Sequence, residues 1–590
     1  MSWNLDDIIN SNDFNEELLL LEHTIKDFDK DLFLYLNGKR KIQDFKKIVL
    51  RNEKILCEIN KIYAFPHLKS ELNSTDTYAS YQKSKAKNII ALYEDVIRNF
   101  FHWVKGIQID KIKPLNDLKA TKLFSRIGDL EYYYTRIRKL SSRTLSLKEE
   151  EIILKLNLIL KSALNEVRNT IETEQIYTFT NPTTNKKEKH SNSSKLLSNL
   201  YSHNELIRKN SYLSLFKPFI KNIQKYFSIY EAVVKSWVQE SKWRGYASPI
   251  EVRNELNDVS NNTVENLIES TRNNRNIFQD FFKLKAQLLN VNKITRYDIY
   301  APIGGRSSKD IPFNTAKKTT LNIFRQFDKQ FYLFAKRLFT EGHIDFKPQK
   351  YKTSGAFCAT LTPNIDPYIL LNYSGNSRDV LILAHELGHA IHSMLASNLP
   401  CSIQEAPLVL AETASTFCEL IVFEFLFKNE KSIDVRRQML MDKITDSYAT
   451  ICRQIYFVKF ENEAHKEIPK GIELSELNNL YMQNLEELYG DSISIDKIFM
   501  NEWAYVPHIV DAPFYCYSYA FGNLLSLVIY KKFINKDIDI IDIKEILAAG
   551  GSENPSQLLS RIGIDIENPL IWSEGFDIVR DWLNELRNTS

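Results

Sequence analysis

Apolar residues recur at three- and four-residue spacing along most of the chain. Between Glu16 and roughly Ile171 this spacing is clear in EELLLLEHTIKDFDKDLFLYL and in KAKNIIALYEDVIRNFFHWVKGI, and it resumes from Leu196 through Asn290. Such periodicity places the apolar side chains on one face of a helix. No repeat of fixed period is evident, which favours an irregular bundle over a solenoid. We therefore predict a mainly α-helical fold that begins with a helical N-terminal lobe.

Two departures from helical spacing divide the chain. The polar stretch 181–195, NPTTNKKEKHSNSSK, contains no large apolar residue and follows the strand-like IYTF. It predicts an exposed loop or hairpin and a boundary between an N-terminal lobe, 1–195, and a second region, 196–590. The segments RYDIYAPI from Arg296 and YILLNYSG from Tyr368 are rich in β-branched and aromatic residues. They predict short strands, and a small sheet ahead of the helical segment that begins near residue 377.

Composition supports the helical prediction and limits the classes of function. The 17 glycines and 17 prolines are each about 3% of the chain, against typical shares of roughly 7% and 5%, which favours long helices. A length of 590 residues predicts two or more packed subdomains, with room for a deep site between lobes. The net charge of +3 gives no electrostatic reason to expect nucleic acid as a partner.

The sequence also predicts where the protein acts. The acidic start lacks an apolar stretch of signal-peptide length, and no uncharged apolar run approaches the roughly 18 residues that cross a bilayer. Six cysteines lie far apart with no CxxC pair, which argues against a disulfide framework or a thiolate metal cluster. We therefore expect a cytosolic protein with reduced thiols and no membrane partner.

The segment VLILAHELGHAIHSMLA carries the strongest chemical signal. Ser377 can cap a helix there, with Asp379 favourably placed in its first turn. On a helix, His385 and His389 are four residues apart and point from the same face, so both imidazoles can reach one Zn²⁺ ion. Glu386 lies beside them, where a carboxylate can act as a general base on a water molecule.

Chance and ordinary packing are the alternatives for this HExxH pattern. With 11 histidines in the chain, a random match is expected on the order of 0.01 times. The histidines could still be hydrogen-bonded residues of a half-buried helix. His392, seven residues after His385, shares its face, but a packed role is at least as plausible for it, and it is left out of the ligand set.

A second cluster follows in LVLAETASTFCELIVFEFLF, an apolar run interrupted by acids. Buried carboxylates need a partner or a metal. Glu412 and Glu419 are seven residues apart and lie on one helical face, whereas Glu424 lies elsewhere. We assign Glu412 as the third zinc ligand and Glu419 as the acceptor that orients a ligand histidine. A plain buried ion pair is the alternative for Glu419. Glu405, in a polar loop, is the weaker candidate for the third ligand.

A third cluster lies in WAYVPHIVDAPFYCYSYAFG. Pro513 suits the first turn of a short helix that would carry the tyrosines, with His508 just before it. Tyr515 and Tyr519 are four residues apart and can share a face, while Tyr517 points across. Histidine and tyrosine can donate hydrogen bonds to an oxyanion that develops beside a metal. The alternative is an aromatic core.

Together these segments resemble the oligoendopeptidase F family, within the wider thimet-oligopeptidase-like group of metallopeptidases. The matching segments spread over about half of the chain in consistent order: RGYASPIEVRN from Arg244, YDIYAPI from Tyr297, SGAFCA from Ser354, PYILLNYSGNSRDVLILAHELGHAIHS from Pro367, LAETASTFCE from Leu410 and PHIVDAPFYCYSYAFG from Pro507. Such an ordered set is far more specific than HExxH alone. Cys418 and Cys516 depart from the familiar motifs without removing a group that metal chemistry needs.

The resemblance implies a zinc metallopeptidase catalytic region in 196–590. It implies one Zn²⁺ ion per chain held by His385, His389 and Glu412, with Glu386 as the base. It further implies that His508 and tyrosines after it, for which we favour Tyr515 and Tyr519, close over the substrate carbonyl.

The resemblance also implies a fold and a substrate class. The fold would be a helical clamshell with a narrow channel that admits short unstructured peptides, and YILLNYSG would be the edge strand that pairs with the substrate backbone. The expected activity is zinc-dependent endopeptidase action on such peptides. A dipeptidyl carboxypeptidase-like exopeptidase and a non-catalytic peptide-binding protein are the alternatives, and the oligomeric state, monomer or dimer, stays open.

Overall fold

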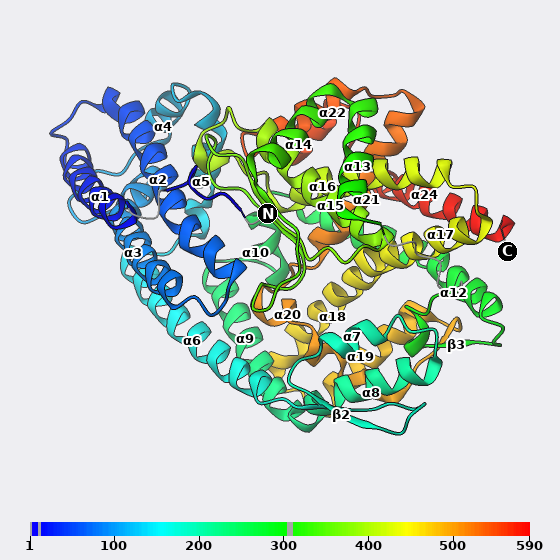
Figure 1. Cartoon of the computed structure of the whole chain (residues 1–590). Helices are drawn as coiled ribbons and strands as arrows, with labels where there is room; N and C mark the ends of the chain where they lie inside the picture. The colour runs from blue at the N-terminus through cyan, green and yellow to red at the C-terminus, as the bar shows by residue number, and fades with distance from the viewer. Residues whose placement is uncertain (1–2, 10–12, 304–310, 590) are drawn as a thin grey trace. The chain divides into compact units, whose positions relative to one another are not determined.

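The computed structural model describes residues 3–9, 13–303 and 311–589, and most of these residues lie in helices (Figure 1). The chain divides into two compact units, each made of three separate segments. Unit 1 comprises Met1–Glu150, Ser308–Leu426 and Lys532–Ile564, and unit 2 comprises Glu151–Ser307, Phe427–Lys531 and Asp565–Ser590. Neither unit ends at the predicted boundary at residue 195. The enclosing clamshell and channel stay predictions.

The N-terminal part of unit 1 is a helical assembly built on the predicted spacing. Its helices are α1 (Phe14–Leu36), α2 (Phe45–Leu72), α3 (Thr77–Lys105), α4 (Asp117–Phe124) and α5 (Glu131–Lys139). In α1 the residues Ile25, Phe28 and Leu32, three and four positions apart, are at most 2% exposed. Asp76 caps α3 by accepting the backbone N–H of Ala79. Burial of these apolar faces stabilises the assembly.

The rest of unit 1 carries the small sheet and the helices around it. These elements are α13 (Phe313–Phe327), α14 (Lys329–Glu341), β4 (Ile344–Asp345), β5 (Phe357–Ala359), β6 (Tyr368–Leu370), α15 (Ser377–Leu395), α22 (Ile540–Ala548) and α23 (Pro555–Ser560), and α16 (Leu408–Asn429) begins there and runs into unit 2. The helix α22 packs against α15, and the Gly551 N–H donates to the Ile403 carbonyl in the connection between α15 and α16. The late segment of unit 1 therefore covers the segment predicted to hold the metal.

The sheet of unit 1 has the order β4-β6-β5. The strand β6 pairs in parallel with β4 and antiparallel with β5, where Phe357 faces Leu370 and Ala359 faces Tyr368. The predicted small sheet is confirmed, but the prediction that YILLNYSG forms an edge strand is wrong. All three residues of β6 are 0% exposed, and neighbouring strands pair with both of its edges. The outer strands of this sheet are β4 and β5.

Unit 2 is built mostly from helices. They are α7 (Ser194–Asn199), α8 (Glu205–Lys221), α9 (Ile223–Trp243), α10 (Pro249–Leu256), α11 (Asn261–Asn274), α12 (Asn276–Leu288), α17 (Ile433–Ser447), α18 (Arg453–Glu467), α19 (Leu474–Tyr489), α20 (His508–Asp511) and α24 (Pro569–Asn588), while α6 (Leu147–Thr173) and α21 (Tyr517–Asn535) extend across the division between the units. The prediction of a mainly helical fold is confirmed.

Two short strand pairs complete unit 2. The hairpin of β1 (Tyr177–Thr180) and β2 (Lys187–His190) is the predicted one. The predicted strand RYDIYAPI is wrong: β3 is only Ile294–Thr295, paired with β7 (Ile493–Ser494), and a 3₁₀ turn follows at once. The carboxylate of Asp298 accepts the backbone N–H and hydroxyl of Thr295, and this capping box turns the chain out of the strand.

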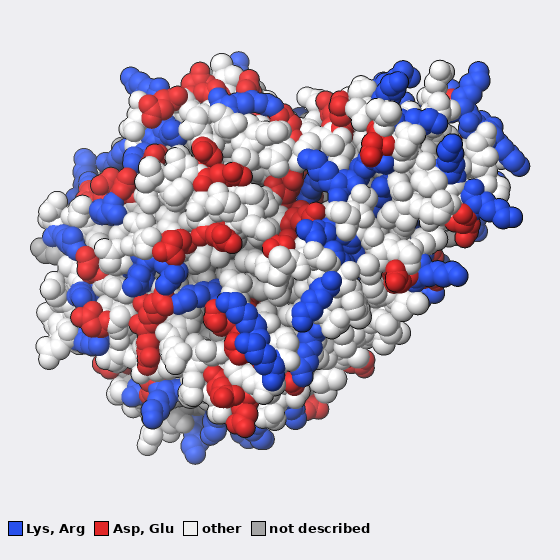
Figure 2. All heavy atoms as spheres, turned by 180° about the vertical axis from the view of Figure 1, so that it is seen from behind, with Lys and Arg blue, Asp and Glu red and all other residues white. Residues whose placement is uncertain are grey.

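The surface and the thiols agree with the composition. On the face shown in Figure 2, basic and acidic side chains are interspersed. Among the residues that the structure describes, no helix is both long and apolar enough to cross a bilayer. All six cysteines are free thiols, three of them buried: Cys418, Cys452 and Cys516.

Candidate metal centre and active site

The helix α15 carries the HExxH segment and is fixed at its start by a capping box. The cap is Asn376, one residue before the predicted Ser377, because its side chain accepts the Asp379 N–H while the Asp379 carboxylate accepts the Asn376 N–H. This acid also accepts the backbone N–H groups of Ser374 and Gly375. The cap therefore fixes the point at which the sheet ends and the metal helix begins.

Gly388 allows α15 and α16 to approach closely. A Cβ at this position would lie 2.6 Å from the Ser415 Cα and 2.7 Å from the Ala414 carbonyl oxygen, both on α16. Only glycine fits such an approach without displacing a helix backbone. Gly388 lies between the two histidines of the motif, and Ala414 and Ser415 follow Glu412 within one turn. The contact therefore brings the three candidate ligands together.

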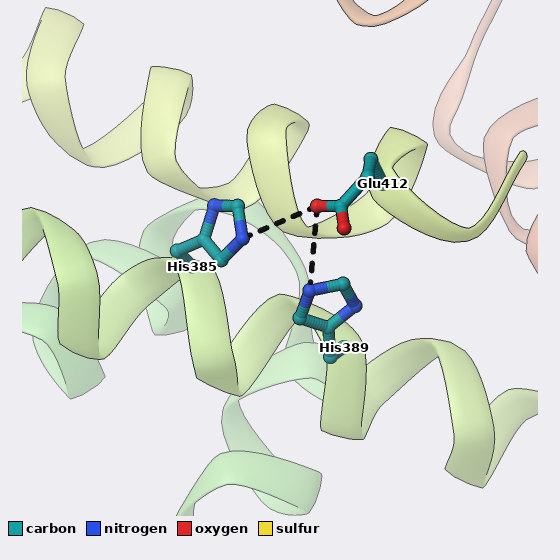
Figure 3. Close-up of side chains that lie close together, drawn as sticks. All are labelled: His385, His389 and Glu412. Carbon is teal, nitrogen blue, oxygen red and sulfur yellow. Dashed lines mark ion pairs between the residues drawn. The ribbon is translucent and has the colours of Figure 1, made fainter. Parts of the chain in front are cut away.

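His385, His389 and Glu412 form one cluster in unit 1. Figure 3 shows both imidazoles pointing from α15 toward the same carboxylate oxygen of Glu412 on α16. The His385 Nε2–Glu412 Oε2 distance is 3.3 Å and the His389 Nε2–Glu412 Oε2 distance is 3.5 Å. Among the described residues this is the group of histidine, cysteine and acidic side chains whose ligand atoms converge within 4.8 Å.

The spacing of these atoms fits a zinc ion. Four ligand atoms placed about 2.1 Å from one ion in a tetrahedron lie about 3.4 Å apart, which matches the two nitrogen–oxygen distances of 3.3 and 3.5 Å. Two imidazole nitrogens and one carboxylate oxygen are also the donor set of catalytic zinc sites, which leave a fourth position open. The residues present therefore fit the metal.

The electrostatics of the cluster demand positive charge. Burial alone would lower the pKa of His385, but hydrogen bonds to Glu412 and Glu419 outweigh it and raise this pKa to about 10. Burial would raise the pKa of Glu412, yet its bonds to His385 and His389 hold it well below the usual range. A bound cation would supply the charge that a protonated histidine supplies here.

Glu419 contacts the other nitrogen of a candidate ligand. Its Oε2 lies 3.3 Å from the His385 Nδ1, so the imidazole is held between Glu412 on one side and Glu419 on the other. Such a contact fixes the tautomer and the orientation of a ligand ring. The rival candidate, Glu405, lies outside the cluster, and so does His392, whose pKa burial lowers to about 4.

Glu386, the predicted base, is a buried residue of unit 1. The residue is 6% exposed, and its Oε2 has no hydrogen-bond partner among the described residues. Burial raises the pKa of this carboxyl, and the positive charges of His385 and His389 oppose the rise. A buried carboxylate oxygen without a partner is costly, and this cost marks Glu386 as a candidate for a functional role.

A cavity of about 620 Å³ lies along β5 in unit 1. Its walls come from α2, β5 and the connection between α15 and α16, and include Tyr63, His67, Phe357, Ala359, Cys401 and Glu405. Cys358, in β5, also lines the cavity; burial raises the pKa of its thiol, and the charges of Glu386 and Glu405 add to the rise. Residues of β5 therefore form one wall of the cavity.

The third predicted cluster lies in unit 2, where three rings meet. The His508 Nε2 is 3.2 Å from the Tyr519 hydroxyl, and the His508 ring stacks on Tyr515 with centroids 5.7 Å apart. The centroids of Tyr515 and Tyr519 are 5.1 Å apart. Tyr517 turns away, because its hydroxyl accepts the Asn257 side-chain N–H in the interior. Burial lowers the pKa of His508, so the neutral ring is favoured.

The backbone around these rings differs from the prediction. His508 begins the short helix α20, and α21 begins only at Tyr517, so the predicted helix from Pro513 is wrong. Phe514 has a φ of +59°, which ends any helix there. Sequence reasoning also missed the role of Gly388 and the outer position of β5 in its sheet. The available signal for Gly388 was a glycine inside an otherwise strong helix. The order of strands in a sheet cannot be predicted from one short segment.

Two histidines and a glutamate that fit zinc, with a free glutamate beside them, define the site of an HExxH metallopeptidase. Residues 198–578 match the model of Peptidase family M3. Because this match covers more than half of the chain, the chain belongs to Peptidase family M3 and is a metallopeptidase.

Relatives agree over nearly the whole length. Oligopeptidase PepF of Bacillus subtilis is 22% identical over 96% of this chain and 84% of its own length. An oligoendopeptidase F homolog of Lactococcus lactis is 26% identical over 90% of this chain and 87% of its own. The crystal structure of oligoendopeptidase-F from Enterococcus faecium shares the fold, with a TM-score of 0.73 at 19% identity over 98% of this chain and 99% of that one.

Proposed function

We propose that this chain is a zinc-dependent endopeptidase that hydrolyses internal bonds of short unstructured peptides in the cytosol. The observation that carries the proposal is the convergence of His385, His389 and Glu412 beside the unpaired oxygen of Glu386. The names of the relatives, oligopeptidase and oligoendopeptidase, support the substrate class. They do not favour the exopeptidase alternative. Six free thiols agree with a reducing compartment.

Each residue has a role in peptide hydrolysis. His385, His389 and Glu412 would hold one Zn²⁺ ion, with Glu419 orienting His385. A zinc ion held there acidifies water and polarises a carbonyl group. Glu386 takes the proton from the attacking water and passes it to the leaving amine. No covalent enzyme intermediate is required.

The remaining roles concern the substrate. We assign His508, Tyr515 and Tyr519 as donors to the oxygen of the tetrahedral intermediate, because imidazole N–H and phenol O–H groups can donate hydrogen bonds to an oxyanion. The 3.2 Å contact between the His508 Nε2 and the Tyr519 hydroxyl supports a shared role for these two groups. We propose that the backbone of the peptide pairs with β5, an outer strand of the sheet whose inner edge is occupied by β6. The cavity along β5 has room for substrate side chains.

The decisive experiment uses quenched peptides of graded length with free and blocked termini, incubated with zinc-loaded protein. We expect cleavage at internal bonds whether or not the termini are blocked. Glu386→Gln should reduce kcat by at least about 10³-fold while the zinc content, measured by mass spectrometry, stays at one per chain. If zinc-loaded protein left a broad peptide library intact, and Glu386→Gln made no difference, the enzyme proposal would be refuted in favour of a peptide-binding protein.

A further inference from the structure

In unit 2, the N–H and the carbonyl oxygen of one backbone peptide group are both hydrogen-bonded to ionisable side chains. The Oε1 of Glu461, on α18, accepts the backbone N–H of Phe514 at 2.7 Å. The Nε of Arg253, on α10, donates to the carbonyl oxygen of Pro513 at 3.0 Å. The Pro513 carbonyl and the Phe514 N–H belong to the same peptide group, so the two side chains fix the plane of that group. We call this arrangement the peptide clamp.

The clamp holds a backbone conformation that the chain would otherwise avoid. Phe514 has a φ of +59°, a left-handed conformation that is unfavourable for a residue other than glycine. Its ring is 0% exposed and lies 4.5 Å, centroid to centroid, from the His465 ring. Strain of this kind persists only where the surroundings enforce it. The two side-chain hydrogen bonds and the buried ring provide that enforcement.

The two charges of the clamp compensate each other. Glu461 is 0% exposed, and burial raises the pKa of its carboxyl to about 8, against the lowering effects of the Phe514 N–H and of Arg253. Burial likewise lowers the pKa of Arg253, and the negative charge available at Glu461 opposes this. Burial thus disfavours the charged form of both groups, and each group offsets part of that effect on the other.

The strained residue lies at the turn that brings the three rings together. The chain leaves α20 after Asp511, turns through Phe514 and enters α21 at Tyr517. Tyr515 follows the clamped peptide directly, and both Tyr515 and Tyr519 contact the His508 ring. A rotation of the clamped peptide would therefore move Tyr515 relative to His508, and would change the start of the helix that carries Tyr519.

We propose that Glu461 and Arg253 are positioning residues that hold the 513–514 peptide so that His508, Tyr515 and Tyr519 keep their mutual arrangement. The inference rests on the proposed function of those three rings. It also gives a role to Arg253 in the segment RGYASPIEVRN, which the metal chemistry leaves without one.

The test compares variants that remove or keep the acceptor. Glu461→Leu removes the acceptor, whereas Glu461→Gln keeps an amide oxygen that can accept the Phe514 N–H. In the zinc-loaded full chain we expect Glu461→Leu to lower kcat at least about 10-fold, with KM within about threefold and zinc content unchanged. Glu461→Gln should stay within about threefold of the wild type. Arg253 is half-buried, and Arg253→Met removes the donor to the Pro513 carbonyl. This variant should lower kcat in the same way as Glu461→Leu.

A double-mutant cycle separates positioning from general destabilisation. If the clamp acts through the rings, Glu461→Leu should cost much less kcat in a Tyr519→Phe background than in the wild type. Lys285→Met is the matched control, since it removes a buried cation that donates to the Ile299 carbonyl elsewhere in unit 2; it should lower stability and leave kcat unchanged.

The possible outcomes distinguish this inference from the function on which it rests. If His508→Ala and Tyr519→Phe leave kcat unchanged, the proposed role of the rings fails, and the clamp loses its purpose with it. If those two variants lower kcat but Glu461→Leu and Arg253→Met do not, or if their effects simply add to that of Tyr519→Phe, only the positioning role is overturned. Failure of Glu461→Leu to fold leaves Arg253→Met to decide between these results.

Discussion

Replacing Gly388 by alanine tests how the metal site is built. The added Cβ would lie 2.6 Å from the Ser415 Cα, whereas ordinary contacts of a Cβ begin at 3.4 Å. The obstacle is backbone rather than a flexible side chain, so α15 and α16 must separate by about 0.8 Å or more. Metal–ligand distances tolerate only about 0.2 Å. Glu412 would therefore be withdrawn from the two histidines.

Gly388→Ala has two opposing effects on the free energy of unfolding, and their magnitudes decide whether the variant is more or less stable than the wild type. Alanine is favoured over glycine inside a helix by about 1 kcal/mol. Overpacking a closed contact costs about 1–3 kcal/mol, and the contact to Ser415 is among the tightest of the glycines described. We expect a lower melting temperature despite the better helix former, and a zinc affinity at least about 10-fold weaker.

The assay is competition for zinc against a chromogenic chelator, combined with thermal melts of the zinc-loaded and zinc-free protein. Ala86→Val, on α3, is the matched control, since it also overpacks a core position, 1% exposed, in unit 1. It should lower the melting temperature and leave the zinc affinity unchanged. If Gly388→Ala instead melted higher and bound zinc within about twofold of the wild type, the close-approach argument would be wrong.

Three further predictions follow from the site and from the clamp. Glu419→Gln should weaken zinc binding about 10–100-fold because Glu419 orients His385, while Glu424→Gln on the same helix should not; equal chelator competition curves would contradict this. Removing zinc with 1,10-phenanthroline should abolish cleavage and lower the melting temperature, and added Zn²⁺ should restore both, whereas activity that survives complete removal would exclude a catalytic metal. Glu461 has a folded-state pKa of about 8 against 4.5 in the unfolded chain, so the unfolded chain releases its proton first and stability falls between about pH 5 and 8, by up to about 1.4 kcal/mol per pH unit. The glutamine side chain of Glu461→Gln does not titrate, so the melting temperature of this variant relative to the wild type should rise with pH over this window. The titratable groups near Glu461 are Arg253, His465, Tyr230 and Cys516. A difference in melting temperature that stays constant with pH would refute the assignment.

Helical periodicity and side-chain spacing were sufficient for much of this protein. The spacing of apolar residues in helices such as α1 and α15 reflects which face of each helix is buried. The four-residue step between His385 and His389 places both on one helical face, whatever surrounds them. The seven-residue step from Glu412 to Glu419 predicts a shared helical face for the same reason. In each case the information lies within one helix, which a single sequence can supply.

The features that sequence reasoning missed depend on segments distant in the chain. The place of β6 in the middle of its sheet depends on β4 and β5, which are too short to be recognised from their own residues. The turn at Phe514 was misjudged because Pro513 is equally suited to a helix start and to a turn. Its outcome is decided by Glu461, 53 residues earlier in the chain. The division predicted at residue 195 rests on an exposed hairpin, which need not separate two cores, and it stays a prediction.

The make-up of unit 1 from three separate segments has a consequence for how the protein is synthesised. Its last segment, Lys532–Ile564, supplies α22, which packs against α15, and Gly551, which bonds to the connection before α16. A chain emerging from the ribosome has completed both HExxH histidines and Glu412 long before this cover exists. We therefore expect nascent chains shorter than about 564 residues to hold zinc poorly, so that proteolytic competence arises only after this last segment of unit 1 has been synthesised.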